Sequence, residues 1–571
     1  MMNPCQTAEC CCQHEYDMKS IDIKMFNRKS VTLWLFLLFV STFGMCDFPE
    51  SRLMNDSALV SWIEIIFICS FKATLLCLML LLGRRWKAGL IVAWLLVVLY
   101  VAVCVCNFVS YTYYGLGISN KLVAILAQTN RNEVSEFMVS LKDRVLSSLG
   151  GPTFWLCVAG LVAATVIIVR YVKAKQMAVT ICMMSAAGLV ISIYLMFAMH
   201  VGRSDVFTSV RVVKTLIRSY RNYNLMSEMM SHKRPHEDIG SIESEKYATN
   251  VCVIIGESAS RDHLSIYGYP LPTSPRLDSR RDSLFVFSDA LASSTLTMYN
   301  MERLLSFKSD GDSIKEWWEF PFTVDVFKAA GYRTYWLSNQ EKTGIWSNSS
   351  YVMIANSDVI RYMKESSEDH ILQRPDGILM PDIKRAFADD SVAKFIGIHL
   401  YGSHILYSQR YPEEYSRFTG EDIMKVRPRP WLNKQSAQKV AEYDNSILYT
   451  DCILDSIIAL AEKSSEPSVV IYLSDHGENV FDDRDYTGRD RKSARVPFII
   501  YANGAYRRRN PEIVERMRNA ADRPFSTANL IYSLLSLSGV SYSYYDPTRD
   551  VLSDSFCPRP RYVDSKVWTE D

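Results

Sequence analysis

Residues 251–258 read Val251-Cys-Val-Ile-Ile-Gly-Glu257-Ser258, a short apolar run that ends in a glycine and a carboxylate. Such a run, bounded by a turn, is typical of a buried strand. Similar runs occupy 332–337, 395–400, 469–473 and 497–501, and helical patterns lie between them at 296–307, 322–330 and 437–463. This alternation predicts an α/β domain with a largely parallel central sheet and helices on both faces.

Polar residues also mark the ends of two further runs. The third run ends in His399-Leu-Tyr-Gly-Ser-His404, and the fourth is followed by Ser-Asp475-His476-Gly. Ligands of open α/β sheets bind beyond the carboxyl ends of the strands, so we expect Glu257, Asp475 and His476 to converge on one metal site. A mixture of oxygen and imidazole ligands suits zinc better than calcium, with manganese as an alternative.

A candidate nucleophile lies in the hydroxyl-rich stretch Ser293-Ser-Thr-Leu-Thr297, at the start of a helical pattern. A helix N-terminus offers free N–H groups and the positive end of the helix dipole, which suit a phosphoryl group. A threonine hydroxyl bound to a divalent cation also loses its proton more readily. The alternative, which the residues alone favour, is that these hydroxyls are ordinary helix caps. His263 and His370 lie outside these motifs and are interpreted as structural.

The first 200 residues differ from the rest because they contain long apolar runs. Spanning a bilayer takes roughly 20 apolar residues. Five segments meet this requirement: 31–48, 59–83, 88–108, 153–173 and 178–199. Basic residues precede the first segment and separate the second from the third and the fourth from the fifth. The positive-inside rule then places residues 1–30 in the cytoplasm, and five crossings place everything after residue 200 outside.

Two polar stretches accompany this membrane part. The loop 109–152 contains Asn130 and Glu133, which belong either to a solvated loop or interfacial helix, or to a patch that meets a lipid headgroup. Residues 201–248 are basic with apolar residues at helical spacing, which fits an amphipathic connector on a membrane face or a plain linker. We therefore expect a transmembrane domain at 31–200 and a catalytic domain at 249–571. The net charge of +1 gives no reason to expect a nucleic-acid partner.

The combined motifs resemble those of the phosphoethanolamine transferases of the alkaline-phosphatase and sulfatase superfamily. The strings that carry the resemblance are Gly256-Glu257-Ser258-Ala-Ser-Arg261, Tyr267-Gly-Tyr-Pro270, His399-Leu-Tyr-Gly-Ser-His404, Tyr443-Asp-Asn445 and Ser474-Asp-His-Gly-Glu478. The resemblance covers nearly the whole chain. It implies a five-helix membrane domain in the bacterial inner membrane and a periplasmic catalytic domain. Among subtypes it is closest to enzymes that modify the heptose of the lipopolysaccharide core, on the string His399–His404 and on Tyr544-Tyr-Asp-Pro-Thr-Arg549.

The resemblance also implies roles for individual residues. Thr297 matches the family nucleophile, which becomes a phosphoethanolamine ester. The matching zinc ligands are Glu257, Asp475 and His476, with the Thr297 oxygen as the fourth. Phosphatidylethanolamine is the implied donor, membrane lipids are the implied surroundings, and lipopolysaccharide is the implied acceptor.

A second metal is a separate question. His399 and His404 match family histidines that face the substrate phosphate or a second metal. The family often has a further histidine after the Asp-His-Gly segment, and this chain has none between residues 477 and 497, which argues against a second zinc. Arg489, Arg491 and Lys492 lie there instead and either bind phosphate or form a solvated loop.

The sequence is compatible with more than one acceptor. Ser293 and Arg303 stand where the lipid A-modifying members have bridged cysteines, which argues against that subtype. The alternatives are the same chemistry on lipid A or a periplasmic glucan, a glycerol-phosphate transferase of the teichoic-acid type, and a non-catalytic membrane sensor or scaffold. A sensor or scaffold is expected to lose metal ligands or nucleophile, and this sequence retains both.

Overall fold

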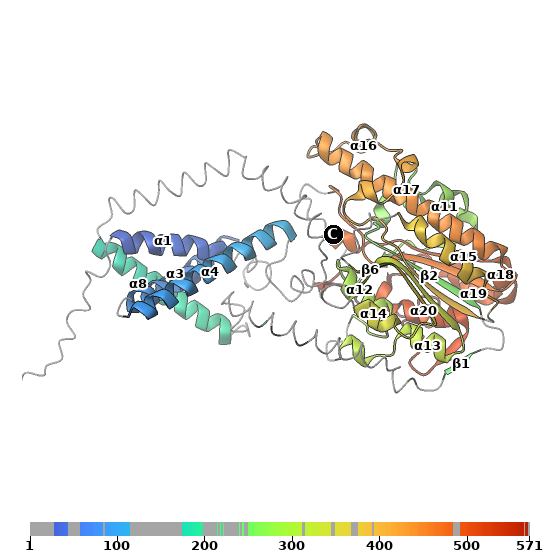
Figure 1. Ribbon diagram of the computed structural model, residues 1–571, viewed down its shortest axis with the longest axis horizontal. Helices are drawn as coiled ribbons and strands as arrows, with labels where there is room; N and C mark the ends of the chain where they lie inside the picture. Colours follow the sequence, from blue (N-terminus) through green and yellow to red (C-terminus); the bar gives the residue numbers. More distant parts are fainter. Residues whose placement is uncertain are drawn as a thin grey trace, which may run out of the picture. The chain divides into compact units, whose positions relative to one another are not determined.

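The computed structural model describes most of the chain after residue 248 and four helices before it. The described residues are 28–43, 58–83, 86–114, 174–197, a few positions between 214 and 244, 249–310, 315–343, 349–366, 375–390, 393–482, 491–564 and 566–568. The chain divides into two compact units, one holding Met1–Val123 with Val139–Arg218, the other Ala124–Met138 with Ser219–Asp571. We call them the helical unit and the α/β unit (Figure 1).

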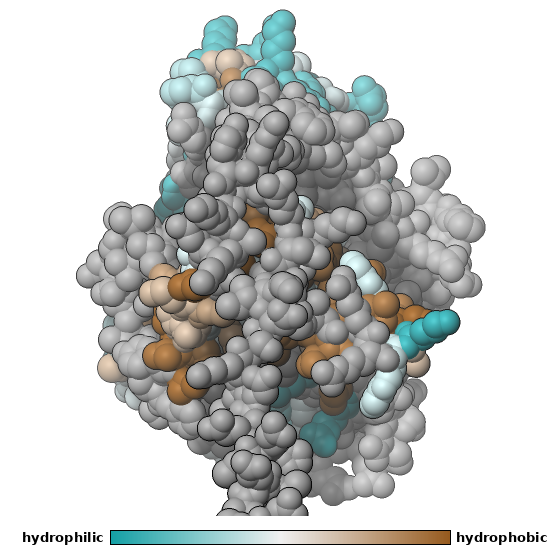
Figure 2. All heavy atoms as spheres, turned by 90° about the vertical axis from the view of Figure 1, so that its left-hand side faces the viewer, coloured by the Kyte–Doolittle hydropathy of each residue, from teal (hydrophilic) through white to brown (hydrophobic). Residues whose placement is uncertain are grey.

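The described part of the helical unit consists of apolar helices, which are α1 (Arg28–Phe43), α3 (Ala58–Gly83), α4 (Lys87–Tyr114) and α8 (Ala174–Phe197). They pack around a core that includes Trp34, Leu76 and Ile181. Other apolar side chains face outward, such as Leu95 at 64% and Met183 at 68% exposure. Figure 2 shows hydrophobic side chains on the described surface of these helices. Exposed apolar surface of this kind is expected where helices meet lipid or another apolar partner.

One described helical segment, Lys87–Asn107 of α4, is long and apolar enough to cross a membrane. Shorter apolar helices occupy Val31–Thr42, Ile65–Leu80 and Val179–Ile193. The predicted segments 31–48, 59–83, 88–108 and 178–199 therefore each overlap a helix. The remaining predictions for this half lie outside the described residues: the segment 153–173, the N-terminal residues up to 27, Asn130, Glu133 and most of the connector 201–248.

The α/β unit is built on a seven-stranded sheet with the order β3-β9-β8-β2-β7-β5-β6. Its strands are β2 (Asn250–Gly256), β3 (Leu284–Val286), β5 (Arg333–Thr343), β6 (Val359–Ser366), β7 (Lys394–His399), β8 (Ser468–Ser474) and β9 (Phe498–Ala502). The strands from β8 to β6 pair in parallel, whereas β9 runs antiparallel to both of its neighbours. The sheet is therefore mixed, and the prediction of a largely parallel sheet holds except at β9.

The predicted strands correspond to β2, β5, β7, β8 and β9, while the sequence pattern does not reveal β3 or β6. β3 has only three residues. β6 reads Val-Ile-Arg-Tyr-Met-Lys-Glu-Ser and lies at an edge of the sheet. An edge strand with charged residues lacks the continuous apolar run by which a buried parallel strand is recognised.

Helices cover both faces of this sheet, as predicted (Figure 1). Because side chains alternate along a strand, Val253 and Ile255 of β2 enter one core and Cys252 and Ile254 enter the other. The first core is shared with α12 (Thr297–Leu304), α13 (Thr323–Ala329), α14 (Ser349–Ile354), α18 (Gly504–Arg509), α19 (Pro511–Asn519) and α20 (Leu530–Ser538). The second is shared with α11 (Pro275–Ser279), α15 (Met380–Ala388), α16 (Gly420–Val426) and α17 (Lys434–Lys463).

Short ladders hold the segments outside the main sheet. They are β1 (Ile242–Ser244) with β11 (Val540–Tyr542), β4 (Ala290–Leu291) with β10 (Phe525–Ser526), and β12 (Tyr562–Val563) with β13 (Lys566–Val567). β4 leads directly into the hydroxyl-rich stretch before α12. The pairing with β10 therefore fixes the start of that stretch.

Three central strands end at the same edge of the sheet. β2 lies between β8 and β7, with Gly256 opposite Ser474 and Ile255 opposite His399. The pairing continues beyond the strands, because the Asp475 N–H donates to the Gly256 carbonyl at 3.0 Å and the Leu400 N–H donates to the Ile255 carbonyl at 2.9 Å. The sheet therefore brings the residues that follow β2, β7 and β8 to one place.

Candidate active site

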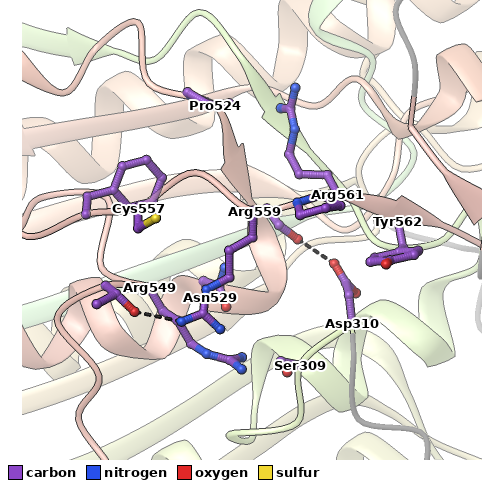
Figure 3. Close-up of a pocket in the computed structure, with 13 residues that line it drawn as sticks. Ser309, Asp310, Pro524, Asn529, Arg549, Cys557, Arg559, Arg561 and Tyr562 are labelled. Carbon is purple, nitrogen blue, oxygen red and sulfur yellow. Dashed lines mark hydrogen bonds between the residues drawn. The ribbon is translucent and has the colours of Figure 1, made fainter.

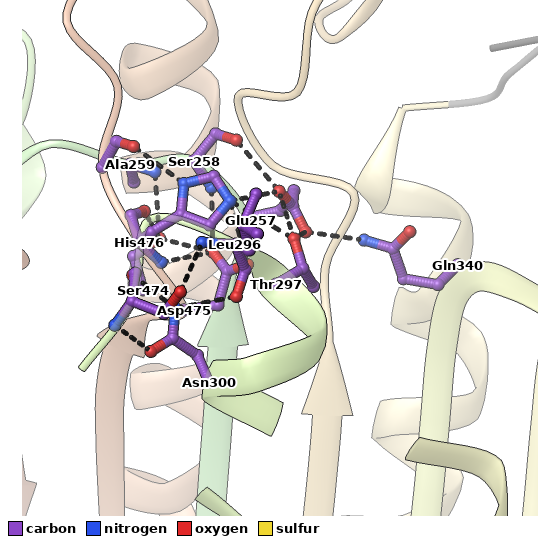
Figure 4. A network of polar contacts seen from close by, with 12 residues as sticks. Glu257, Ser258, Ala259, Leu296, Thr297, Asn300, Gln340, Ser474, Asp475 and His476 are labelled. Carbon is purple, nitrogen blue, oxygen red and sulfur yellow. Dashed lines mark hydrogen bonds and ion pairs between the residues drawn. The ribbon is translucent and has the colours of Figure 1, made fainter. Parts of the chain in front are cut away.

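Glu257, Asp475 and His476 come together at this edge, where each contributes a potential metal ligand atom and all three atoms lie within 4.8 Å of one another. The His476 Nε2 atom is 3.5 Å from Glu257 Oε1 and 3.5 Å from Asp475 Oδ2. All three side chains are buried. We call this group the open cluster, and Figure 4 shows it at the ends of the strands.

Thr297 joins the open cluster from the first position of α12. Its Oγ1 donates toward both carboxylate oxygens of Glu257, each at 3.2 Å, and lies 3.3 Å from His476 Nε2 (Figure 4). The cap position belongs to Leu296, which makes no side-chain cap hydrogen bond. The interpretation of Thr297 as an ordinary helix cap is therefore wrong, because its hydroxyl faces the carboxylate and not the helix backbone.

The orientation of the ligand atoms suits a cation. His476 Nδ1 lies 2.8 Å from the Gly477 carbonyl, which can only accept, so Nδ1 carries a proton and Nε2 is the ring nitrogen that could coordinate a metal. Asp475 Oδ1 accepts from the Ser258 and His476 N–H groups at 3.1 and 2.6 Å. Asp475 Oδ2 is buried and accepts no hydrogen bond from any residue in the described part of the chain. Two carboxylates and an imidazole, with one buried carboxylate oxygen that accepts no hydrogen bond, fit a divalent metal of the zinc type.

The loop before Thr297 is fixed by side chains that the sequence pattern did not single out. Asn300 donates to the carbonyls of Ser294 and Leu296 at 2.7 and 3.1 Å, and its own oxygen accepts from the Ser294 N–H at 3.0 Å. Asp564 accepts from the hydroxyls of Ser294 and Thr295 at 2.7 and 2.9 Å. The nucleophile loop is thus held from within α12 and from the C-terminal end of the chain.

The two other predicted histidines lie at the end of β7 and in the loop after it, residues 400–406, which we call the β7 loop. His399 is buried at the end of β7, with its ring edge toward Trp336, and burial lowers its pKa to about 4 although Asp475 opposes this effect. His404 is partly buried, with its ring 5.2 Å from that of Tyr401. Among the described residues, neither histidine belongs to the metal-type group of Glu257, Asp475 and His476.

The β7 loop also approaches the open cluster through its backbone. Asp376 accepts from the N–H groups of Tyr401 and Gly402 at 2.8 and 2.9 Å. Gly402 has a φ of 52°, and a Cβ at this position would lie 2.7 Å from the Glu257 carbonyl oxygen. Glycine is therefore required here, because any side chain would displace the backbone that carries Glu257.

Gln340 is a further polar residue that the sequence did not indicate. It extends from β5 and donates to the Leu400 carbonyl at 2.9 Å, and its Nε2 lies 3.5 Å from Glu257 Oε2 (Figure 4). Its position could be inferred only from the order of the strands in the sheet, because β5 pairs in parallel with β7. Gln340 therefore links a fourth strand to the open cluster.

The other residues singled out in the sequence either lie away from the open cluster's ligand atoms or fall outside the described part of the chain. Arg303 donates to Asp310 at 3.1 Å and to the Tyr299 carbonyl at 2.8 Å. Ser293 is buried, and Lys492 is exposed. Asn130, Glu133, His370 and Arg489 lie outside the described residues, as does the side chain of Arg491.

His263 agrees with its structural interpretation. Its Nδ1 lies 2.6 Å from Asp444, and its Nε2 lies 3.1 Å from Asp482. Burial alone would lower the pKa of His263, but the two carboxylates raise it to about 9. We call His263, Asp444 and Asp482 the closed cluster.

Comparison with known proteins identifies a family and several relatives of this chain. The family model described as "Sulfatase" matches residues 249–540, more than half of the chain. Phosphoethanolamine transferase EptC of Escherichia coli (strain K12) is 29% identical over 331 residues, and the match covers 56% of this chain and 56% of that protein. Phosphoethanolamine transferase CptA of Salmonella typhimurium is 28% identical over 322 residues, with 54% of each chain covered. The chain thus spans about half the length of the curated relatives it matches.

Solved structures extend the comparison. The C-terminal periplasmic domain of EcEptC from Escherichia coli, in complex with Zn, has a TM-score of 0.53 and 28% identity, covering 58% of this chain and 94% of that chain. The integral membrane protein EptA of Neisseria meningitidis has a TM-score of 0.61 at 17% identity, covering 93% of this chain and 98% of that chain, which shows a shared fold. These matches confirm the resemblance to phosphoethanolamine transferases. Because the family model covers more than half of its length, the chain belongs to the sulfatase family.

Proposed function

We propose that this protein transfers phosphoethanolamine from phosphatidylethanolamine to a lipopolysaccharide acceptor, through a covalent intermediate on Thr297. The observation that carries this proposal is the position of the Thr297 hydroxyl, 3.2 Å from both oxygens of Glu257 and 3.3 Å from His476 Nε2. A hydroxyl in this position is a candidate nucleophile with an acceptor for its proton within reach. The names of the EptC and CptA relatives support the choice of the transferred group.

The open cluster is the proposed zinc site. Glu257, Asp475 and His476 would hold the ion, and a related EptC domain has been solved in complex with Zn. When bound, the metal would lower the pKa of the Thr297 hydroxyl and offset the charge of the phosphate. The Ser258 and His476 N–H groups orient Asp475, and the Gly477 carbonyl fixes the tautomer of His476. One zinc ion is proposed, and manganese is the alternative.

The proposed reaction has two balanced halves. In the first, the Thr297 oxygen attacks the donor phosphorus, its bond to phosphorus forms, and the bond from phosphorus to the diacylglycerol oxygen breaks. The Thr297 proton ends on the released diacylglycerol. In the second, an acceptor oxygen attacks the same phosphorus, the bond to Thr297 breaks, and the acceptor proton returns to Thr297. The positive N-terminal end of α12, where Thr297 lies, would favour the phosphoryl charge in both halves.

Substrate binding is proposed for the residues around this centre. His399 and His404 follow from the resemblance; His399 ends β7, and His404 lies in the following loop, whose backbone approaches Glu257. Because burial keeps His399 neutral at pH 7, it would contact the phosphate as a hydrogen-bonding group and not as a cation. Asn130 and Glu133 are proposed to meet the ethanolamine headgroup at the membrane surface.

The proposed arrangement in the cell follows from the charge pattern and from the fold. Residues 1–30 would be cytoplasmic, residues 31–200 would cross the bacterial inner membrane five times, residues 201–248 would connect, and residues 249–571 would be periplasmic. The fold shared with the full-length integral membrane protein EptA supports this arrangement. The core heptose is the preferred acceptor, with lipid A, a periplasmic glucan or a glycerol-phosphate reaction as alternatives. A scaffold without catalysis would not need the intact open cluster.

The test is expression in a Gram-negative host that lacks its own phosphoethanolamine transferases. Mass spectra of the lipid A and core fractions, taken separately, should show added phosphoethanolamine on the core. Thr297→Ala should abolish it, whereas Thr419→Ala, which removes an exposed hydroxyl that caps α16, should not. An addition that survives Thr297→Ala would contradict the covalent step, and an addition on lipid A would overturn the acceptor but keep the chemistry. No addition in any fraction would favour the glucan or scaffold alternatives.

A further inference from the structure

A second polar site lies in the α/β unit, away from the open cluster. It is a pocket of about 210 Å³ between the C-terminal segment, the start of α20 and the chain that follows α12. Its walls include Arg549, Arg559, Arg561, Asn529, Phe556 and Tyr562, and no residue of the open cluster lines it. In Figure 3, Arg549, Arg559 and Asn529 lie close together in the wall, with Ser309 and Asp310 beside them. The proposed reaction therefore leaves this pocket without a role.

The three arginines differ in how fully they are paired. Arg561 donates to both carboxylate oxygens of Asp289, at 2.7 and 2.8 Å, so its fork is engaged. Arg559 uses one terminal nitrogen, which donates to Thr548 at 2.7 Å and to Asp546 at 3.5 Å. Arg549 approaches Asp546 only through Nε, at 3.4 Å. Within the described part of the chain, the terminal nitrogens of Arg549 and one of those of Arg559 make no hydrogen bond.

The charge around the pocket is positive. The ion pairs there join four arginines to three aspartates: Arg303, Arg549, Arg559 and Arg561 with Asp289, Asp310 and Asp546. Asp310 is the acidic residue in the lining, and both of its oxygens are occupied, by Arg303 at 3.1 Å and by Ser526 at 2.8 Å. The remaining donors of Arg549 and Arg559 therefore select an anion, and an arginine fork suits the oxygens of a phosphate.

The other walls indicate what the phosphate is attached to. Phe556 and Tyr562 are partly exposed aromatic side chains in the wall, and the Arg523 guanidinium lies over the Phe556 ring at 5.7 Å, which leaves the opposite face of that ring as apolar surface. The amide of Asn529 makes no hydrogen bond with the described residues, although it stands at the cap position of α20. Aromatic faces, a free amide and an arginine pair together match a sugar ring that carries a phosphate. Inorganic phosphate alone would leave the aromatic walls unused.

The pocket is joined to the nucleophile loop by continuous structure. α12 begins at Thr297 and has eight residues, so about 12 Å of helix leads from Thr297 toward Ser309 and Asp310 in the pocket wall. From the other side, Tyr562 is two residues before Asp564, which holds Ser294 and Thr295. The string Tyr544-Tyr-Asp-Pro-Thr-Arg549 also ends in this wall.

We propose that this pocket binds a phosphate-bearing sugar of the acceptor, with Arg549 and Arg559 holding the phosphate and Phe556 and Tyr562 contacting the ring. That the bound sugar belongs to the acceptor rests on the proposed transferase function. The affinity of the pocket for a sugar phosphate does not depend on that function. The pocket would anchor the acceptor at a distance from the reacting oxygen. It would therefore act on acceptor affinity and not on the chemical step.

The first experiment measures binding of glucose 6-phosphate to the full chain in detergent by isothermal titration calorimetry. Arg549→Gln and Arg559→Gln should each weaken binding about tenfold, because each removes a charge-assisted pair with the phosphate. The matched control is Arg518→Gln, which removes an exposed arginine paired with Glu515 in α19. Glucose and inorganic phosphate should both bind more weakly than glucose 6-phosphate. Thermal melts of each variant establish that it is folded.

The outcomes separate the pocket from the open cluster. Binding that is lost in Glu257→Gln but retained in both arginine variants would place the ligand at the open cluster and overturn the proposal. Equal binding by wild type, the arginine variants and Arg518→Gln, or no binding by wild type, would overturn it as well. Inorganic phosphate binding as tightly as glucose 6-phosphate would remove the sugar from the proposal.

The second experiment tests the link to transfer with purified lipopolysaccharide before and after phosphatase treatment. Arg559→Gln should raise KM for the untreated acceptor about tenfold and leave kcat unchanged. The effect should vanish with the phosphatase-treated acceptor. A fall in kcat at constant KM would contradict acceptor binding in the pocket. If no transfer occurs with wild type, the proposed function fails, yet the calorimetric result still decides whether the pocket holds a sugar phosphate.

Discussion

The α/β unit contains two groups that each combine one histidine with two carboxylates, the closed cluster and the open cluster. In the closed cluster, each nitrogen of His263 faces its own carboxylate, at 2.6 and 3.1 Å. Those carboxylates have further partners, because Tyr269 donates to Asp444 at 2.6 Å and Arg429 donates to Asp482 at 2.6 Å. The closed cluster therefore satisfies itself with groups from the chain.

The open cluster is arranged in the opposite way. Glu257 and Asp475 both approach a single imidazole nitrogen, each at 3.5 Å. In the described part of the chain, no arginine or lysine forms an ion pair with Asp475. Two buried carboxylates that converge on one imidazole nitrogen form a place where a bound cation would be strongly stabilised. The difference teaches that pairing, and not the presence of aspartate and histidine, distinguishes a structural cluster from a metal-type one.

Matched substitutions in the two clusters should give the largest contrast. Asp475→Asn removes a proposed zinc ligand, so zinc content should fall from about one ion per chain to near zero and transfer should fall on the order of 10³-fold. Asp444→Asn makes the same chemical change in the closed cluster and should keep the zinc. Metal analysis of purified protein and transfer assays measure both effects. Zinc retained in Asp475→Asn, or lost in Asp444→Asn, would contradict the assignment.

The reverse contrast is expected for stability. His263→Gln removes the cation between the buried Asp444 and the partly buried Asp482, and should lower the free energy of unfolding by about 3 kcal/mol. His404→Gln, at a partly buried position outside the closed cluster, should change it by less than about 1 kcal/mol. Urea denaturation followed by tryptophan fluorescence measures both values. A small loss in His263→Gln would mean that Arg427 and Arg429 suffice for Asp482.

A smaller effect should appear as a dependence of stability on pH. Burial opposes protonation of His263, but Asp482 and Asp444 raise its pKa from 6.5 to about 9 in the folded protein. The folded state therefore holds more protons between these values, so this contribution is complete below pH 6.5 and is lost as pH rises through 9. The pKa of Asp482 is lowered by the same pairing despite burial, so its contribution is lost in acid. The unfolding free energy should decline from pH 6.5 to 9 in wild type and stay flatter in His263→Gln.

The sequence predicted the parts of this contrast that depend on local patterns. Apolar runs that end in Glu257 and Asp475 predicted both the strands and their convergence, because parallel neighbours share an edge. No such sequence pattern indicates that β9 runs antiparallel or that β3 and β6 are strands. Gln340, Asn300 and Asp564 act through contacts that depend on the folded chain, and Asp564 contacts Thr295 from 269 positions away. The second nitrogen partner of His263 likewise lies 219 positions away.

Asp564 gives the smallest predicted effect and the sharpest test of how the open cluster is held. The closed cluster orients its own members, whereas Thr297 depends on a loop whose Ser294 and Thr295 hydroxyls donate to Asp564. Asp564→Asn keeps the shape and tolerates the φ of 52°, but replaces one acceptor oxygen by a donor. We expect kcat to fall about tenfold with KM and zinc content unchanged, and the exposed Asp554→Asn to behave as wild type. A rise in KM alone would show that the C-terminal segment serves the substrate and not the nucleophile. Unchanged kinetics would show that Asn300 alone fixes the loop, from within α12 itself.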